Sequence, residues 1–222
     1  MNYIDRIVGM FINPDKTTDD IANNPMIEEA LLIVGIYAIL AMLSSYILTS
    51  HISYIYNISG VSQSGLQNTS TATVAFSLLS GLIVPLVLWA VITVILHVFA
   101  LFFGGKGKIY PQMMTVIGYT DVVKIIAYAI AVILFTQLPY ATITISSTNI
   151  LSIISSATNN AVYQSVYYTA GTLVILLGVI ISSLMGVFAI KNGEKLSLAL
   201  SAVVVGLPLV IYLIIHFVTT SL

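Results

Sequence analysis

Five apolar stretches, most of them at least about 20 residues long, constrain the fold of this chain more than any other feature. They run approximately over residues 30–48, 75–102, 113–135, 166–190 and 196–218. As an α-helix, each is long enough to cross about 30 Å of hydrocarbon. Because lipid offers no partner for open backbone groups, and because the runs do not alternate as barrel strands do, we predict helices. The sequence therefore predicts an all-α fold, a polytopic membrane protein with a bundle of five transmembrane helices.

The scarcity of charge supports this fold class and excludes others. Only 7% of the 222 residues are charged, 59% are hydrophobic, and the mean hydropathy is +1.06. A soluble domain carries about 25% charged residues. The net charge of -1 argues against a nucleic-acid partner, and the absence of cysteine excludes disulfides and cysteine metal sites.

Basic residues outside the apolar runs occur in only three segments. The connections at about 49–74 and 136–165 contain no lysine or arginine. By the positive-inside rule, the amino terminus is expected in the cytoplasm and the carboxyl terminus outside. The six basic residues on the predicted cytoplasmic side are Arg6, Lys16, Lys106, Lys108, Lys191 and Lys195.

Two glycosylation sequons lie on the predicted outer side. They begin at Asn57 and Asn68. Chance is the alternative explanation, because loops rich in Ser, Thr and Asn generate such sequons by composition alone.

Residues 1–29 are expected to form a cytoplasmic segment, followed by the five-span domain over residues 30–222. Helical spacing gathers apolar side chains on one face, opposite Asp5 and Arg6, which predicts an interfacial amphipathic helix. Asn13 can cap a second helix that starts at Pro14. A merely solvated tail is the alternative. The apolar face consists of Ile4, Ile7, Val8, Phe11 and Ile12.

Asp121 and Lys124 are a candidate intramembrane ionisable pair, three residues apart and hence on one helical face. If the third span begins at Met113, Asp121 lies about 12 Å deep, which favours a proton or ion pathway. If the span instead ends near Ala141, Asp121 lies at the cytoplasmic interface, and Lys124 extends toward the headgroups as an anchor. Both alternatives remain open from the sequence.

Small residues recur every four positions in the fourth span, at Gly178, Ser182 and Gly186. Such a stripe permits two helices to approach closely. It predicts either a homo-oligomer interface or close packing within one chain.

The three histidines are not expected to form a metal site. His51 and His216 fall near the outer ends of their spans, whereas His97 falls near the inner end of the second, where a helix-packing role is expected. No metalloprotease, nucleophile-elbow, phosphate-loop or dinucleotide motif is present. We therefore expect no enzyme activity and no cofactor.

The second apolar run ends in a glycine-rich connection, and the third opens with a Gly-Tyr pair and a small residue. This pattern resembles the Yip family, the Ypt/Rab-interacting membrane proteins, whose second span ends in a Gly-Gly-rich cytoplasmic loop and whose third opens with Gly-Tyr-small. A tight turn between two long helices is the alternative explanation for the glycines. The matching residues are His97, Gly104, Gly105, Lys106, Gly107, Gly118, Tyr119 and Thr120.

The resemblance extends to the amino terminus, where Phe11-Ile12-Asn13-Pro14 and Asn24-Pro25 are similar to the family's approach to its first span. It implies a membrane scaffold or adaptor that engages membrane lipids and a protein partner from the cytoplasmic face. In eukaryotic members that partner is a prenylated small GTPase. The chain lacks their Asp-Leu-x-Gly-Pro element and has Val122-Val123 where family members often carry proline. A compact prokaryotic member in the cell membrane, whose partner the sequence does not name, fits better.

The predicted orientation can be tested directly because the chain contains no cysteine. A single cysteine at Ser64 should react with a membrane-impermeant thiol reagent added to intact cells, and one at Lys108 should react only after lysis. The reverse labelling pattern would contradict the positive-inside assignment.

Overall fold

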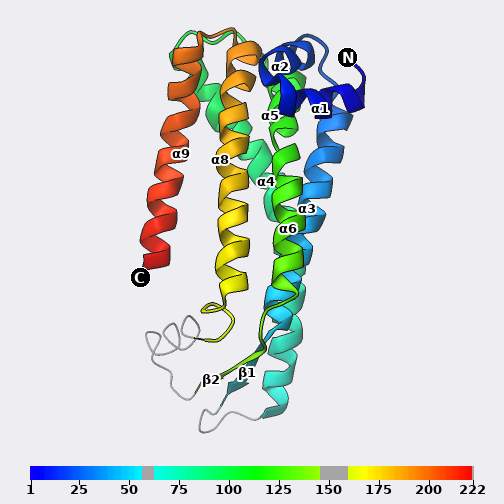
Figure 1. Cartoon of the computed structure of the whole chain (residues 1–222), viewed down its shortest axis with the longest axis vertical. Coiled ribbons are helices and arrows are strands. Elements are labelled where there is room, and N and C mark those ends of the chain that lie inside the picture. The colour runs from blue at the N-terminus through cyan, green and yellow to red at the C-terminus, as the bar shows by residue number, and fades with distance from the viewer. Residues whose placement is uncertain (57–62, 146–159, 222) are drawn as a thin grey trace. The chain divides into compact units, whose positions relative to one another are not determined.

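The structure is a computed structural model, and it describes residues 1–56, 63–145 and 160–221 (Figure 1). Helices make up most of the chain, and two short strands accompany them. The helices are α1 (Tyr3–Ile12), α2 (Pro14–Asn23), α3 (Ile27–Ser50), α4 (Gln63–Phe102), α5 (Met114–Thr120), α6 (Val122–Phe135), α8 (Val166–Glu194) and α9 (Leu198–Ser221). A π-helical turn η1 (Ile109–Met113) precedes α5, and the strands are β1 (Ile52–Tyr56) and β2 (Ala141–Ile145).

Five helical segments are long and apolar enough to cross a membrane. They are Ile27–Ser50, Thr71–Phe102, Ile109–Phe135, Val166–Glu194 and Leu198–Val218. The predicted fold class, an all-α polytopic membrane protein, is confirmed.

The two helices before the first span form where their capping residues predict. The Asn2 side chain accepts a hydrogen bond from the backbone N–H of Asp5 at the start of α1, and Asn13 caps α2, whose first residue is Pro14. The side chains of Arg6 and Met10 are buried in the protein. The opposite face of α1 exposes its apolar side chains, so this helix is amphipathic with its apolar face outward. The exposed residues are Ile4, Val8, Phe11 and Ile12.

The third span is broken at Asp121, which ends α5 and precedes α6. The N–H of Asp121 donates to the carbonyl of Gly118, three residues back, at 3.2 Å. Helix α6 ends at Phe135, before β2 begins at Ala141. The helical segment that contains Asp121 runs over Ile109–Phe135, and Asp121 lies about 10 Å along the helix from Met114. The depth of Asp121 in the membrane, on which the two alternatives differ, stays a prediction.

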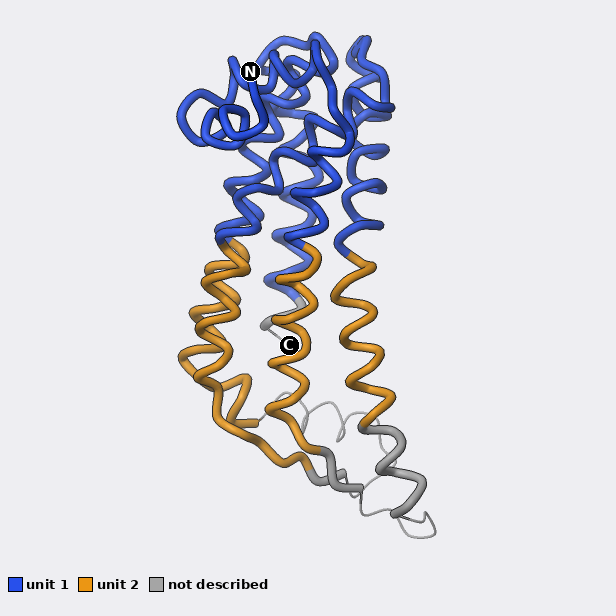
Figure 2. Tube along the Cα trace, turned by 90° about the vertical axis from the view of Figure 1, so that its right-hand side faces the viewer, with its two compact units in different colours: residues 1–37, 85–126, 177–222 blue, residues 38–84, 127–176 orange. Residues whose placement is uncertain are grey.

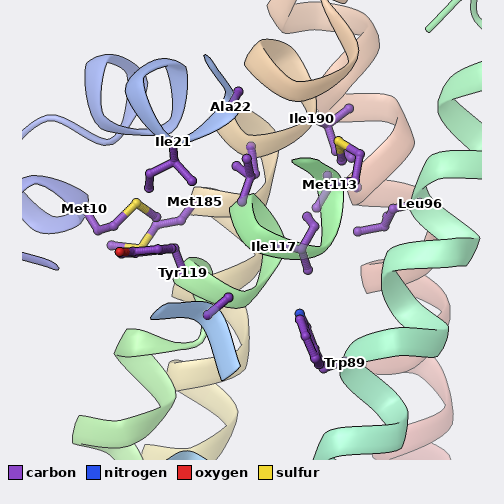
Figure 3. Packing of buried hydrophobic residues seen from close by; sticks show 14 of the residues in the cluster. Met10, Ile21, Ala22, Trp89, Leu96, Met113, Ile117, Tyr119, Met185 and Ile190 are labelled. Carbon is purple, nitrogen blue, oxygen red and sulfur yellow. The ribbon is translucent and has the colours of Figure 1, made fainter. Parts of the chain in front are cut away.

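The chain divides into two compact units (Figure 2). Unit 1 contains Met1–Tyr37, Pro85–Ile126 and Leu177–Leu222, and unit 2 contains Ala38–Val84 and Ala127–Leu176. The core of unit 1 joins side chains from α1, α2, α3, α4, α5, α8 and α9. In Figure 3, Met10 from α1 lies beside Tyr119 from α5 in this core. The amino-terminal helices are therefore part of the packed unit and not a separate tail.

Unit 2 contains a two-stranded sheet that the sequence analysis did not anticipate. Strands β1 and β2 pair in parallel, with Ile52 opposite Ala141 and Tyr56 opposite Ile145. Both segments are rich in β-branched or aromatic residues, as strands are. The signal is short and lies inside two polar connections, so composition pointed to loops. The core of unit 2 includes Phe135.

Candidate functional site

The Gly118–Tyr119 pair lies where α5 passes close to α3. A Cβ atom added at Gly118 would lie 2.7 Å from the Cβ of Ala30 and 3.2 Å from Nε1 of Trp89. That indole donates its Nε1–H to the carbonyl of Met114 at 3.1 Å, tying α4 to α5 (Figure 3). Glycine is therefore required here by the close approach of three helices, because any larger side chain would separate them.

The next residue, Tyr119, links α5 to the amino-terminal helices. Its ring is fully buried, and its hydroxyl donates a hydrogen bond to Glu29. The same Glu29 oxygen accepts from Nη1 of Arg6 at 2.9 Å. Arg6 also donates from Nε to Asp20 at 2.9 Å and from Nη2 to the carbonyl of Asn24 at 3.0 Å. One guanidinium thus joins α1, α2 and the start of α3, using the forked geometry that lysine lacks.

Electrostatics keeps the Arg6–Asp20 pair charged at neutral pH. Burial lowers the pKa of the Arg6 guanidinium, but its hydrogen bonds with Asp20 and Glu29 outweigh burial and hold this pKa above its ordinary value. Burial likewise raises the pKa of Asp20, but the hydrogen bonds and positive charges of Arg6 and of the amino-terminal ammonium together outweigh burial and hold this pKa below its ordinary value. Both groups therefore act as fixed charges that stabilise the docked helices.

A second polar junction joins α8 to the glycine-rich connection through Glu194, whose side chain has no exposed surface. Its Oε1 lies 2.5 Å from Nδ1 of His97, and its Oε2 accepts the backbone N–H of Gly107 at 2.9 Å. Its carbonyl accepts the N–H of Lys106 at 3.0 Å. The expectation that His97 is a helix-packing residue agrees with this geometry, because its ring is engaged in holding α4 against the end of α8.

The three glycines of this connection serve two different purposes. Gly104 has a positive φ of 85°, which suits a tight turn. A Cβ at Gly105 would lie 2.8 Å from Oε2 of Glu194, and one at Gly107 would lie 2.5 Å from the carbonyl oxygen of Gly193. The turn explanation from the sequence therefore applies to Gly104, whereas Gly105 and Gly107 make room for a buried carboxylate.

A third link joins α2 to the end of α8. Lys191 donates from Nζ to Asp15 at 2.7 Å. Asn192 donates to the Asp15 side chain at 2.9 Å and to the Thr18 hydroxyl at 2.8 Å. The hydrogen bond from Lys191, with a further one from Asn192, holds the pKa of Asp15 below its ordinary value near 3.8.

The candidate ion pair of the third span is formed, with Asp121 buried and Lys124 partly buried. Nζ of Lys124 lies 2.7 Å from Oδ1 of Asp121, which is 4% exposed. The same oxygen accepts from Ser182 on α8 at 3.4 Å, and the ammonium lies 5.4 Å from the ring centre of Tyr37. Within the apolar span Asp121 and Lys124 neutralise each other, as the cost of a lone charge in hydrocarbon requires.

The small-residue stripe of α8 faces the interior of unit 1. Gly178, Ser182 and Gly186 are all buried. Ser182 reaches Asp121, and a Cβ at Gly186 would contact Val205 of α9 at 3.6 Å. In the single chain this stripe packs helices together, and a homo-oligomer formed through it stays a prediction.

The remaining candidates are the other histidines and the two sequon asparagines. His51 lies 2.8 Å from the carbonyl of Ile47 and stacks on Tyr140 in unit 2. Over residues 1–56, 63–145 and 160–221, no group of three His, Asp or Glu side chains could hold a metal ion. Asn57 and the side chain of Asn68 lie outside the described residues.

Sequence reasoning missed the acidic partners of these junctions. No motif marks Glu29 or Glu194, and helical spacing predicts Arg6 only on the face opposite the apolar residues of the first helix. One usable signal was position: Glu194 stands between Lys191 and Lys195, directly at the end of an apolar run. A carboxylate there either reaches water or needs a buried donor, and the sequence does not say which.

We expect Glu194→Ala to lower the free energy of unfolding by about 3 kcal/mol, because it leaves His97 and the Gly107 N–H without their acceptor. Glu28→Ala, which removes an exposed carboxylate, should change it by less than about 0.5 kcal/mol. Unfolding of the full chain in mild detergent measures both. Equal effects would show that Glu194 holds nothing in place.

The Asp15–Lys191 link predicts a specific pH dependence. Because the folded pKa of Asp15 is lowered, its stabilising contribution is present above pH 3.8 and is lost as the pH falls through the folded pKa. The melting temperatures of wild type and Asp15→Asn should therefore differ at pH 7, and the difference should shrink as the pH falls below 3.8. Asp19→Asn, at a weaker 3.7 Å pair, is the control and should show a smaller difference. A wild-type advantage that does not shrink below pH 3.8 would contradict the link.

Comparison with known proteins gives one match. No curated protein and no solved structure matches the chain. The Yip1 domain family matches residues 8–220, which spans α1 to α9 and includes both glycine-containing junctions. With its five candidate spans, the chain is a multi-pass membrane protein that belongs to the Yip1 domain family.

Proposed function

We propose that this protein is an integral membrane scaffold or adaptor that presents a cytoplasmic surface to a protein partner. One observation carries the proposal: three polar junctions, at Arg6, Glu194 and Asp15, fasten α1, α2 and the glycine-rich connection to the ends of the spans. An adaptor gains affinity when its contact surface is ordered before binding, because less conformational entropy is lost in the complex. The proposed membrane is that of a prokaryotic cell, with the amino terminus in the cytoplasm.

Helix α2 supplies the surface that best suits a protein partner. Thr17, Thr18, Ile21 and Ala22 are buried, whereas Lys16, Asp19 and Asn23 are exposed. Their spacing of three and four residues puts these exposed side chains on one helical face. We call Lys16, Asp19 and Asn23 the polar stripe and propose it as the partner contact.

Helix α1 has a different role in this proposal. Its apolar face leaves Ile4 and Ile12 exposed by 68% and 78%. Such a face suits the boundary between headgroups and acyl chains, where an amphipathic helix buries its apolar side. Arg6 and Met10 attach the opposite side of the helix to unit 1. Helix α1 would then hold the polar stripe at a fixed height above the membrane.

The family supports a role other than catalysis. The Yip1 domain family is a family of non-enzymatic membrane proteins. The buried side chain of Tyr119 bonds to Glu29, and the buried carboxylate of Glu194 bonds to His97 and the Gly107 N–H, so both serve packing. The proposal accordingly includes neither a cofactor nor a chemical reaction.

Site-specific photocrosslinking in native membranes tests the adaptor role. A benzoylphenylalanine at Asn23 in the polar stripe should give a discrete protein adduct, whereas one at Ile214, exposed on the apolar span α9, should not. Arg6→Gln should reduce the Asn23 adduct at least about tenfold, because it releases α1 and α2 from Glu29 and Asp20. Identical adducts from both positions, or an adduct unaffected by Arg6→Gln, would contradict the proposal.

The competing function is a small proton- or ion-coupled channel or transporter. Substitution of Asp121 distinguishes this function from that of a scaffold. Purified protein in liposomes with pH and ion indicators should show no flux above empty vesicles. Flux that Asp121→Asn abolishes would contradict a pure scaffold, because only a conducting pathway depends on that carboxylate.

A further inference from the structure

The connection between α4 and η1 combines a rigid backbone with two exposed lysines. Six residues, 103–108, separate the candidate spans that end at Phe102 and begin at Ile109. All six backbone N–H groups in this connection donate hydrogen bonds within the chain. Their acceptors are the carbonyls of Ala100, Leu101 and Glu194 and the side chains of Glu194 and Gln112. Despite its glycines, the connection therefore has no free N–H with which to cradle a phosphate, so any anion must be bound by side chains.

Lys106 and Lys108 project to the same side of the connection, because side chains alternate between two sides along an extended segment. Lys108 has extended backbone angles, with φ -102° and ψ 131°. Cβ atoms at Gly105 and Gly107 would point at Glu194. Because successive residues of extended chain face opposite sides, Lys106 and Lys108 project away from that carboxylate, about 7 Å apart along the chain. Both are exposed, and neither forms an ion pair with a described residue.

Exposed aromatic side chains flank the two lysines. Phe102 is 82% exposed and Tyr110 is 62% exposed. Aromatic rings are enriched at the level of the headgroups, where one part of the environment is apolar and the other is wet. A connection of six residues between two spans cannot extend far from that level. A soluble anion would satisfy the lysines and leave the rings in water, whereas a phospholipid accounts for both.

We propose that Lys106 and Lys108, with Phe102 and Tyr110 beside them, form a binding site for the headgroup of an anionic phospholipid. Glu194 and Gln112 hold the backbone so that both ammonium groups face the lipid phosphates. The site is separate from the polar stripe on α2 and does not depend on a protein partner. A negative result in the lipid-binding experiment would therefore leave the proposed protein contact intact, and a missing photocrosslinked adduct would leave the lipid site intact.

Native mass spectrometry of the full chain in mild detergent tests the site, with phosphatidylglycerol and phosphatidylcholine of equal chain length as probes. Phosphatidylglycerol should bind more tightly. A Lys106→Gln/Lys108→Gln variant should lose about thirty-fold in affinity for it, about fivefold for each lysine. Its melting temperature should stay at the wild-type value, because both side chains are exposed.

The matched control is Lys16→Gln on α2, which removes another exposed lysine that forms no ion pair with a described residue. It should weaken phosphatidylglycerol binding by less than about twofold, because Lys16 lies outside the site. Equal loss in the control and the double variant would mean diffuse attraction and would overturn the site. Equal binding of the two lipids would also overturn it. Displacement of phosphatidylglycerol by millimolar glycerol phosphate would show a soluble-phosphate site and would overturn the lipid assignment.

Discussion

The cost of burying a charge without a partner is the constraint on which unit 1 depends. Arg6 is 3% exposed and Glu194 has no exposed surface. An isolated charge in such surroundings costs several kcal/mol, so each is stable only where its full set of partners is present. Arg6 meets this condition by bringing α1, α2 and α3 together, and Glu194 by bringing α8, α4 and the glycine-rich connection together. The two charges thereby determine how the end of the bundle is assembled.

This constraint explains the family motifs in physical terms. Gly105 and Gly107 leave space for the Glu194 carboxylate, and Gly118 leaves space for Ala30 where α5 meets α3. Tyr119 follows at once and donates to Glu29, the neighbour of Ala30. In both places a glycine lets two segments approach closely, and a nearby polar group forms a hydrogen bond across the contact. This arrangement joins helices with few polar residues.

The assembled end of unit 1 offers three surfaces with different chemistry. The outer face of α1 is apolar, and the polar stripe of α2 carries a lysine, an aspartate and an asparagine. The connection after α4 carries two lysines beside aromatic rings. In the proposed arrangement, the first lies in the membrane boundary, the second contacts a protein and the third binds lipid phosphates. An adaptor needs such a division, because a surface that binds lipid is not free to bind a partner.

Apolar runs, capping residues and the glycine-containing motifs were enough to predict five spans, the helix break at Asn13-Pro14 and the family. These signals are local, since each depends on residues within a few turns of one another. The partners of Arg6, Glu29, His97 and Glu194 were not predictable, because they come from segments far apart in the chain, up to 97 residues for His97 and Glu194. The parallel pairing of β1 with β2 was missed for the same reason. By itself the sequence determined which segments are helical and apolar. Only the tertiary structure decided which charges are buried and paired, because the free energy of a buried charge depends on neighbours that the folded chain supplies.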